Sequence, residues 1–106
     1  MAILYNANMQ MRERIMKQLS TVMDPELFVD IVSLGLIYDV KVTGKKIKVT
    51  MTLTTPGCLL APEIDRLVRE VLKPLGNYEI ELELVWEPAW SKDRMSEEAK
   101  LQLGMI

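Results

Sequence analysis

Histidine is absent from this chain, and cysteine occurs once, at Cys58. The lack of histidine excludes, within one chain, both histidine-dependent nucleophilic catalysis and metal sites with histidine ligands. A single cysteine cannot form an intramolecular disulfide, which is typical of proteins from a reducing cytoplasm. The sequence therefore predicts a cytoplasmic protein whose thiol chemistry would depend on one sulfur atom.

Long apolar runs and a strong charge of either sign are also missing. No segment has transmembrane length, and no cationic start precedes an apolar core, so we expect neither a membrane span nor a signal peptide. The formal net charge is −2, which provides little attraction for nucleic acid or an anionic membrane. We expect no nucleic-acid partner and no membrane partner.

The composition is that of one ordinary globular domain. The chain has 106 residues, of which 49% are hydrophobic and 26% are charged. A chain of this size can bury a core without a disulfide or a metal. We interpret residues 1–8 as a flexible N-terminal arm and residues 9–106 as a single domain.

Hydrophobic periodicity predicts the secondary structure. Apolar residues recur at helical spacing within residues 11–23 and 64–72, and residues 96–103 form a third, shorter helical pattern. Polar and apolar residues alternate in three other segments, which predicts strands within 34–42, 46–54 and 78–86. In the first of these strands the alternation places four residues on one face: Leu36, Tyr38, Val40 and Val42.

The predicted order of elements is α-β-β-α-β-α. A glycine turn joins the first two strands as an antiparallel hairpin, and a helix crosses over between the second and third strands, which should therefore be parallel. The expected fold class is α/β (α+β): a single two-layer domain with a three-stranded mixed sheet and helices packed on one face. The other, more polar face should meet solvent or a partner.

Cys58 lies between the second predicted strand and the helix that follows it. Unpaired N–H groups and the dipole at a helix start favour a thiolate, and Thr54 and Thr55 add hydroxyls nearby. Cysteine is also among the most buried residue types, so position alone leaves a functional and a structural role equally open. Pro62 would remove an early hydrogen bond from a helix capped by Cys58, so the helix should begin a few residues later.

Three further features are candidates for structural or functional roles. Asp24 and Glu26 flank a proline in the pattern of a short helical turn, and locally this structural interpretation is favoured. Both tryptophans lie in "WEPAW"; such a corner usually anchors a tail against the core, although Trp90 could also mark an interface. Gly35 is expected to meet a backbone requirement.

Three segments in combination resemble the iron–sulfur cluster assembly accessory family that includes SufT and PaaD: "DPELFVDIVSLGLIYDVKV", "MTLTTPGC" and "EPAWSKDRM". The resemblance covers about residues 9–104 and implies a compact α/β domain, often dimeric. The family's recurrent cysteine matches Cys58, its threonine matches Thr54, and its acidic turn matches Asp24 and Glu26.

The chain departs from the family pattern at two places. Leu59 follows the cysteine where the family usually has proline, and "PAW" replaces a Pro-Pro-Trp near the end of the chain. Trp90 is retained, but its turn has one proline fewer.

The resemblance implies a non-enzymatic factor that assembles or delivers iron–sulfur clusters. Cys58 would transiently ligate iron or a cluster, supported by Thr54, Thr55, Asp24 and Glu26. Such clusters are normally held by four thiolates, so one chain offers an incomplete and labile site, and a homodimer would supply two thiolates. The expected cargo is a labile cluster or iron, absent from the isolated protein, and the expected partners are an assembly scaffold and client apoproteins.

Two alternatives stay open. A metal-free adaptor would dock client apoproteins onto the assembly machinery through the exposed sheet face, Trp90 or the N-terminal arm, or would serve one oxygenase system, as PaaD-like members suggest. A thiol enzyme based on Cys58 ranks last, because the chain has no histidine and few polar groups for an oxyanion hole. We therefore expect no enzymatic activity.

Overall fold

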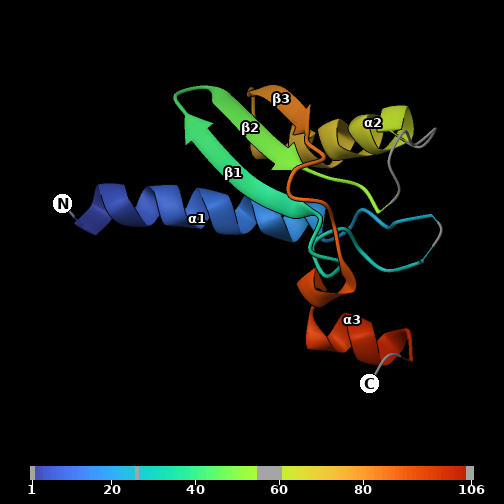
Figure 1. The fold of residues 1–106 in the computed structure, drawn as a ribbon. Helices are drawn as coiled ribbons and strands as arrows, with labels where there is room; N and C mark the ends of the chain where they lie inside the picture. Colours follow the sequence, from blue (N-terminus) through green and yellow to red (C-terminus); the bar gives the residue numbers. More distant parts are fainter. Residues whose placement is uncertain (1, 26, 55–60, 105–106) are drawn as a thin grey trace.

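A central sheet and the helices around it make up the fold (Figure 1), seen in a computed structural model that describes residues 2–25, 27–54 and 61–104. The elements, in chain order, are α1 (Ala2–Leu19), β1 (Ile37–Thr43), β2 (Lys46–Met51), α2 (Ala61–Leu72), the 3-10 turn η1 (Lys73–Leu75), β3 (Glu79–Leu84), the 3-10 turn η2 (Lys92–Arg94) and α3 (Glu97–Gln102). This order confirms the predicted one.

The sheet has the order β1-β2-β3, with β2 in the centre. β1 pairs antiparallel with β2, and β2 pairs parallel with β3 in an unbroken register from Lys46 opposite Glu79 to Met51 opposite Leu84. The parallel pair follows from the crossover through α2, because a chain cannot return to the start of a neighbouring strand through a short turn. The mixed three-stranded sheet is confirmed.

The apolar face of the sheet is covered by α1 and α2, which contact each other as well as β1 and β3 respectively. Ile47, Val49 and Met51 of the central strand are fully buried, as expected from their alternation with lysine and threonine. Three residues of α2 at helical spacing are also buried: Ile64, Val68 and Leu72. The two-layer arrangement is therefore confirmed for the described residues.

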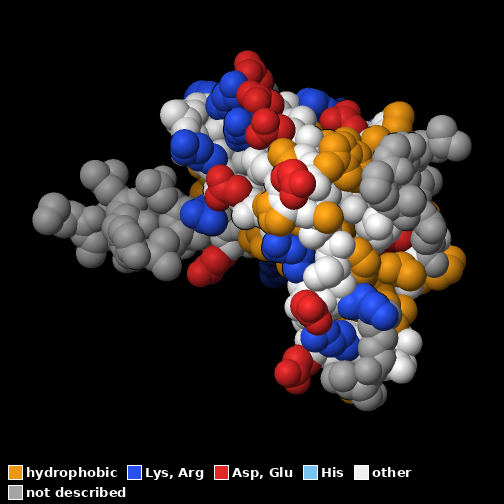
Figure 2. Space-filling view, in the orientation of Figure 1, with side chains coloured by type: hydrophobic (Ala, Val, Ile, Leu, Met, Phe, Trp, Pro, Cys, Tyr) orange, Lys and Arg blue, Asp and Glu red, His pale blue; other side chains and the backbone are white. Residues whose placement is uncertain are grey.

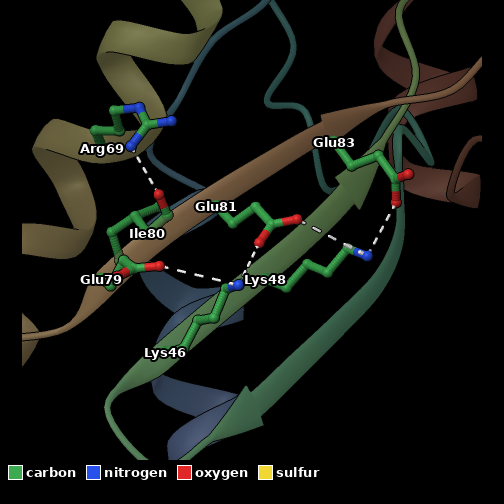
Figure 3. A network of polar contacts seen from close by, with 7 residues as sticks. All are labelled: Lys46, Lys48, Arg69, Glu79, Ile80, Glu81 and Glu83. Carbon is green, nitrogen blue, oxygen red and sulfur yellow. Dashed lines mark hydrogen bonds and ion pairs between the residues drawn. The ribbon is translucent and has the colours of Figure 1, made fainter.

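The opposite face of β2 and β3 carries alternating charges (Figure 3). Lys46 Nζ lies 2.6 Å from Glu81 Oε1, and Lys48 Nζ lies 3.3 Å from Glu83 Oε1. The hydrogen bond from Lys46 lowers the pKa of Glu81, and the same bond raises the pKa of Lys46. Acidic and basic side chains lie next to one another over this part of the surface (Figure 2), so the charges on this face largely compensate one another.

The first helix begins earlier than predicted. Residues 2–8, which we expected to be a loose arm, have helical backbone and belong to α1. No glycine or proline interrupts residues 2–24, and alanine, leucine and methionine favour helix, so nothing local ends the helix before Leu19. The N-terminal part of α1 projects beyond the sheet (Figure 1), and the chain measures 43 × 28 × 25 Å along its principal axes. The division into an arm and a domain stays a prediction.

A β-bulge corrects the predicted face of Tyr38. The register shifts between Ile37, which pairs with Met51, and Asp39, which pairs with Thr50. Paired residues share a face, so Ile37 rather than Tyr38 points to the same side as the buried Met51. Alternation alone could not reveal this, because one extra residue in a strand reverses the phase of the residues before it.

The C-terminal segment is anchored on residues 33–35. Trp90 Nε1–H donates to the carbonyl of Leu34 at 2.6 Å, and the N–H of Ser96 donates to the carbonyl of Ser33 at 2.8 Å. Gly35 has φ +76°, and a Cβ there would lie 2.7 Å from the carbonyl carbon of Arg94 and nearer still to its oxygen. Gly35 therefore meets the backbone requirement that the sequence indicated.

Candidate functional site

Cys58 itself lies outside the described residues, as do Thr55 and Glu26. The structure describes the two ends of the segment that carries the cysteine, which are Thr54 after β2 and Ala61 at the start of α2. Because α2 runs from Ala61, Pro62 occupies the first turn, where a missing N–H removes no hydrogen bond within the helix. This agrees with the prediction that the helix begins after the cysteine.

Asp24 is a buried residue that shapes a tight turn. Its side chain is 4% exposed, and its Oδ1 accepts the N–H of Leu27 at 3.0 Å. Its backbone carbonyl accepts the N–H of Phe28, and its own N–H donates to the carbonyl of Val29, both at 2.9 Å. An aspartate that accepts local N–H groups in this way closes a turn without continuing a helix. The turn is thus confirmed, and a role for Asp24 at a cluster stays a prediction.

The same turn presents an apolar surface that the sequence did not signal. Phe28 has φ +57° and is 71% exposed, and the nearby Met23 is 48% exposed. A bulky residue rarely adopts a left-handed backbone, since its Cβ is crowded there. Hydrophobic side chains are visible at the surface on this side of the molecule (Figure 2). The acidic turn therefore holds an aromatic side chain in solvent.

A chain of backbone hydrogen bonds ties this turn to the exit of β2. The N–H of Ile31 donates to the carbonyl of Val22 at 2.9 Å, and the N–H of Leu36 donates to the carbonyl of Ile31 at 3.1 Å. The N–H of Thr52 then donates to the carbonyl of Leu36 at 2.9 Å. The segment that contains Asp24 and the strand end that leads toward Cys58 consequently lie at the same end of the sheet (Figure 1).

Thr52 is a polar residue that the sequence analysis did not select. It is 0% exposed, and its hydroxyl has no hydrogen-bond partner within the part of the chain that the structure describes. Alternation along β2 predicts that Thr52 lies on the polar face with Lys46 and Lys48. Thr52 is nevertheless buried, and so is Leu36, whose carbonyl accepts the N–H of Thr52, which means that this end of the sheet is covered. A buried, unpaired hydroxyl is destabilising by about 1–3 kcal/mol. Its place shortly before the cysteine segment adds Thr52 to the candidate site.

Trp90, clusters of metal ligands and membrane spans are the remaining features to be considered, and each is assessed for the described residues. Trp90 is half-buried and its indole N–H is bonded to Leu34, so it acts as an anchor, and its docking role stays a prediction. Among residues 2–25, 27–54 and 61–104, no three acidic side chains gather as a metal site would require. None of the described helices is long and apolar enough to cross a membrane.

Comparison with known proteins gives one family and several relatives. Residues 12–81 match the family model described as "Iron-sulfur cluster assembly protein". The "Fe-S protein maturation auxiliary factor YitW" of Bacillus subtilis is 46% identical over 97 residues, which cover 90% of this chain and 95% of that protein. The "Fe-S protein maturation auxiliary factor SufT" of Staphylococcus aureus is 45% identical over 86 residues, which cover 79% of this chain and 98% of that protein.

Two further relatives differ in kind. An "Iron-sulfur cluster carrier protein" of Deinococcus radiodurans is 44% identical over 62 residues, covering 58% of this chain and only 18% of that longer protein. A crystal structure of a DUF59 domain from Bacillus anthracis, described as a domain of unknown function, superimposes with a TM-score of 0.83 and 44% identity. It covers 89% of this chain and 92% of that one.

Proposed function

Because the chain belongs to the iron–sulfur cluster assembly protein family, we propose that it is an auxiliary factor that helps to mature iron–sulfur proteins without catalysing a reaction itself. The observation that carries this proposal is the match of 90% and 79% of the chain, respectively, to two maturation auxiliary factors at 46% and 45% identity. Its partners are then components of the assembly machinery and client apoproteins, in the cytoplasm.

Cys58 is the proposed ligand for the cargo, which is iron or an iron–sulfur cluster. Cluster irons are held by thiolates, and Cys58 is the only cysteine of the chain. Part of the chain is similar to an iron–sulfur cluster carrier protein, which supports the proposal that Cys58 binds this cargo transiently. A homodimer contributes two thiolates, and the scaffold or the client completes the set, so that the cluster leaves easily.

The residues around the cysteine have supporting roles in this proposal. Asp24 is committed to the turn through Leu27, which supports a role in shaping the site rather than in binding iron. Thr54 and Thr55 lie in the sequence before Cys58 and offer hydroxyls that can hydrogen-bond to a thiolate sulfur. Glu26, two residues after Asp24 in the sequence, offers a carboxylate oxygen.

The test is anaerobic reconstitution with iron and sulfide, using wild type, Cys58→Ser and Ser33→Ala as a matched control of another small polar side chain. We expect bound iron and charge-transfer absorption in the wild type and in the control, and the loss of both in Cys58→Ser. Equal iron content and absorption in all three proteins would contradict direct ligation. Sedimentation of the loaded and unloaded wild type reports whether loading accompanies a dimer.

A metal-free adaptor is the second candidate, and the exposure of Phe28 and Met23 favours it. These side chains offer a client an apolar contact at the surface. The discriminating experiment measures client maturation in cells that carry either Cys58→Ser or Phe28→Asn. Loss with Phe28→Asn and full activity with Cys58→Ser would favour the adaptor, whereas the reverse would favour the carrier. A deficit confined to one oxygenase would identify dedicated service.

A further inference from the structure

A shallow hollow of about 460 Å³ lies where β1 begins. It is lined by Gly35, Ile37, Tyr38, Pro88 and Arg94. Two segments that are far apart in the chain therefore form its walls, one entering the first strand and the other following the last. The anchoring of residues 90–96 on residues 33–35 holds these walls together.

The aromatic wall of the hollow is fixed before any ligand arrives. The bulge places Tyr38 out of phase with the core residues of β1. The Tyr38 hydroxyl donates to the carbonyl of Pro88 at 2.8 Å, and the Arg94 Cζ lies 4.6 Å from the centroid of the tyrosine ring. A guanidinium stacked on a ring in this way is oriented, so less of its conformational freedom is lost when it binds a ligand.

The charge of Arg94 is not balanced by an ion pair within the described part of the chain. Arg66 pairs with Glu63 at 2.7 Å and Arg69 pairs with Asp65 at 3.0 Å, whereas the guanidinium of Arg94 stacks on the ring of Tyr38. Stacking uses the face of the guanidinium and leaves its N–H edge for hydrogen bonds. That edge matches a carboxylate, which it can bind through two parallel N–H···O bonds.

We propose that this hollow binds an acidic side chain of a partner polypeptide, with Arg94 holding the carboxylate and Ile37 and Pro88 contacting an adjacent apolar side chain. An extended polypeptide fits better than a small molecule because the hollow is open, and small ligands need to be mostly enclosed. Ile37 and Tyr38 also belong to β1, an edge strand of the sheet, whose backbone can pair with an extended segment. The site does not involve Cys58, so it extends the proposed function and can be tested separately from it.

The test uses the full chain and the blocked peptide acetyl-Val-Leu-Glu-Val-amide, whose single carboxylate is the glutamate side chain. Titration is followed by NMR through the Nε–H of Arg94 and the backbone N–H groups of Ile37 and Tyr38. We expect saturable shifts, about tenfold weaker binding when glutamine replaces the glutamate, and a loss of at least about tenfold in Arg94→Gln. Arg94→Lys should retain part of the affinity, since lysine keeps the charge but not the two-bond geometry.

Lys92→Gln is the matched control, because it removes one positive charge from the same 3-10 turn. Weakening by Lys92→Gln as large as that by Arg94→Gln would overturn the proposal in favour of general electrostatic attraction. Acetate is the second probe: if it shifts Arg94 at the same concentration as the peptide, the site is one for small anions and the polypeptide assignment fails. The proposal is also overturned if the signals of Arg94, Ile37 and Tyr38 in the folded wild-type protein do not shift at peptide concentrations up to about 10 mM.

Discussion

Gly35 is a residue at which the backbone of another segment, at Arg94, passes very close to the chain. Its left-handed φ and the nearby Arg94 carbonyl together leave no room for a side chain, whereas Gly44, with φ +58°, has nothing within 4 Å of an added Cβ. The two glycines therefore separate the effect of backbone conformation from the effect of a steric clash.

We predict that Gly35→Ala lowers the free energy of unfolding by about 2–4 kcal/mol, because the clash displaces residues 90–96 in addition to straining φ. Gly44→Ala should lower it by only about 1 kcal/mol, the cost of the left-handed backbone alone. Urea unfolding of both variants checks this. Equal losses at the two positions would show that the approach of Arg94 is not what demands glycine.

Thr52 permits a second prediction at the scale of one atom. Thr52→Val replaces an unpaired buried hydroxyl by a methyl group, so the free energy of unfolding should stay the same or rise by up to about 1 kcal/mol. Thr50→Val, at a half-buried position two residues earlier, is the control and should change little. A loss above about 1 kcal/mol in Thr52→Val alone, again in urea unfolding, would mean that the hydroxyl is bonded in the native protein.

The paired strands β2 and β3 are joined by ion pairs between their side chains. Lys46 and Lys48 of β2 form ion pairs with Glu81 and Glu83 of β3. Because the side chains of each pair are partly exposed, solvent screens their attraction. The pKa of Glu81 is lowered chiefly by its hydrogen bond from Lys46 and then by the charge of the same residue. A carboxyl whose pKa is lowered in the folded protein stabilises it above its unfolded pKa, and this stabilisation disappears as the pH falls through the folded pKa.

We therefore predict that Glu81→Gln lowers the midpoint of thermal unfolding slightly at pH 7, and that the difference from wild type vanishes as the pH falls below about 4. Glu87→Gln is the control, because no ion pair of Glu87 is present among the described residues. Thermal scans across this pH range give the comparison. A difference that persists undiminished in acid would rule out the ion pair as its origin.

The elements also show what sequence can predict and what it cannot. Alternation and crossover length were enough for the hairpin, the parallel pair and the face of β2 that carries Ile47 and Val49, because these depend on local pattern. Tyr38 was assigned to the wrong face because a bulge is set by the geometry of pairing. Likewise, the burial of Thr52 depends on contacts between distant segments, which periodicity does not record.

The candidate site was less predictable than the fold. The turn at Asp24 followed from its Asp-Pro pattern, whereas the exposed, left-handed Phe28 had no local signal. Cys58 and Thr55 follow from their position before a predicted helix, and the resemblance to a family assigns Cys58 and Glu26 to the site; the roles of all three remain predictions. Local pattern thus identified the turn, and only the three-dimensional structure placed the turn at the same end of the sheet as the exit of β2.

On the scale of the whole molecule, α1 makes the protein elongated. The radius of gyration is 14.2 Å, above the value of about 13 Å expected for a compact chain of this length. The N-terminal part of the helix projects beyond the sheet (Figure 1), and Ile15 is its first fully buried residue among those described. The core therefore depends on the second half of α1.

We predict that removal of residues 1–8 changes the free energy of unfolding by less than about 0.5 kcal/mol, since residues 2–8 belong to the end of α1 that projects beyond the sheet (Figure 1). Ile15→Ala is the matched comparison and should lower the free energy of unfolding by about 2–5 kcal/mol through a cavity in the core. Both values come from urea unfolding at one protein concentration. If the truncation were as destabilising as Ile15→Ala, the N-terminal turns of α1 would have to unfold cooperatively with the core.

The central position of β2 has a consequence for synthesis on the ribosome. Its antiparallel neighbour β1 precedes it, but its parallel neighbour begins only at Glu79. During translation the hairpin can form while the other edge of β2 has no partner strand. A released chain that is truncated after α2 is therefore expected to self-associate through that edge, and a chaperone that shields the edge until Leu84 has emerged would raise the yield of folded protein.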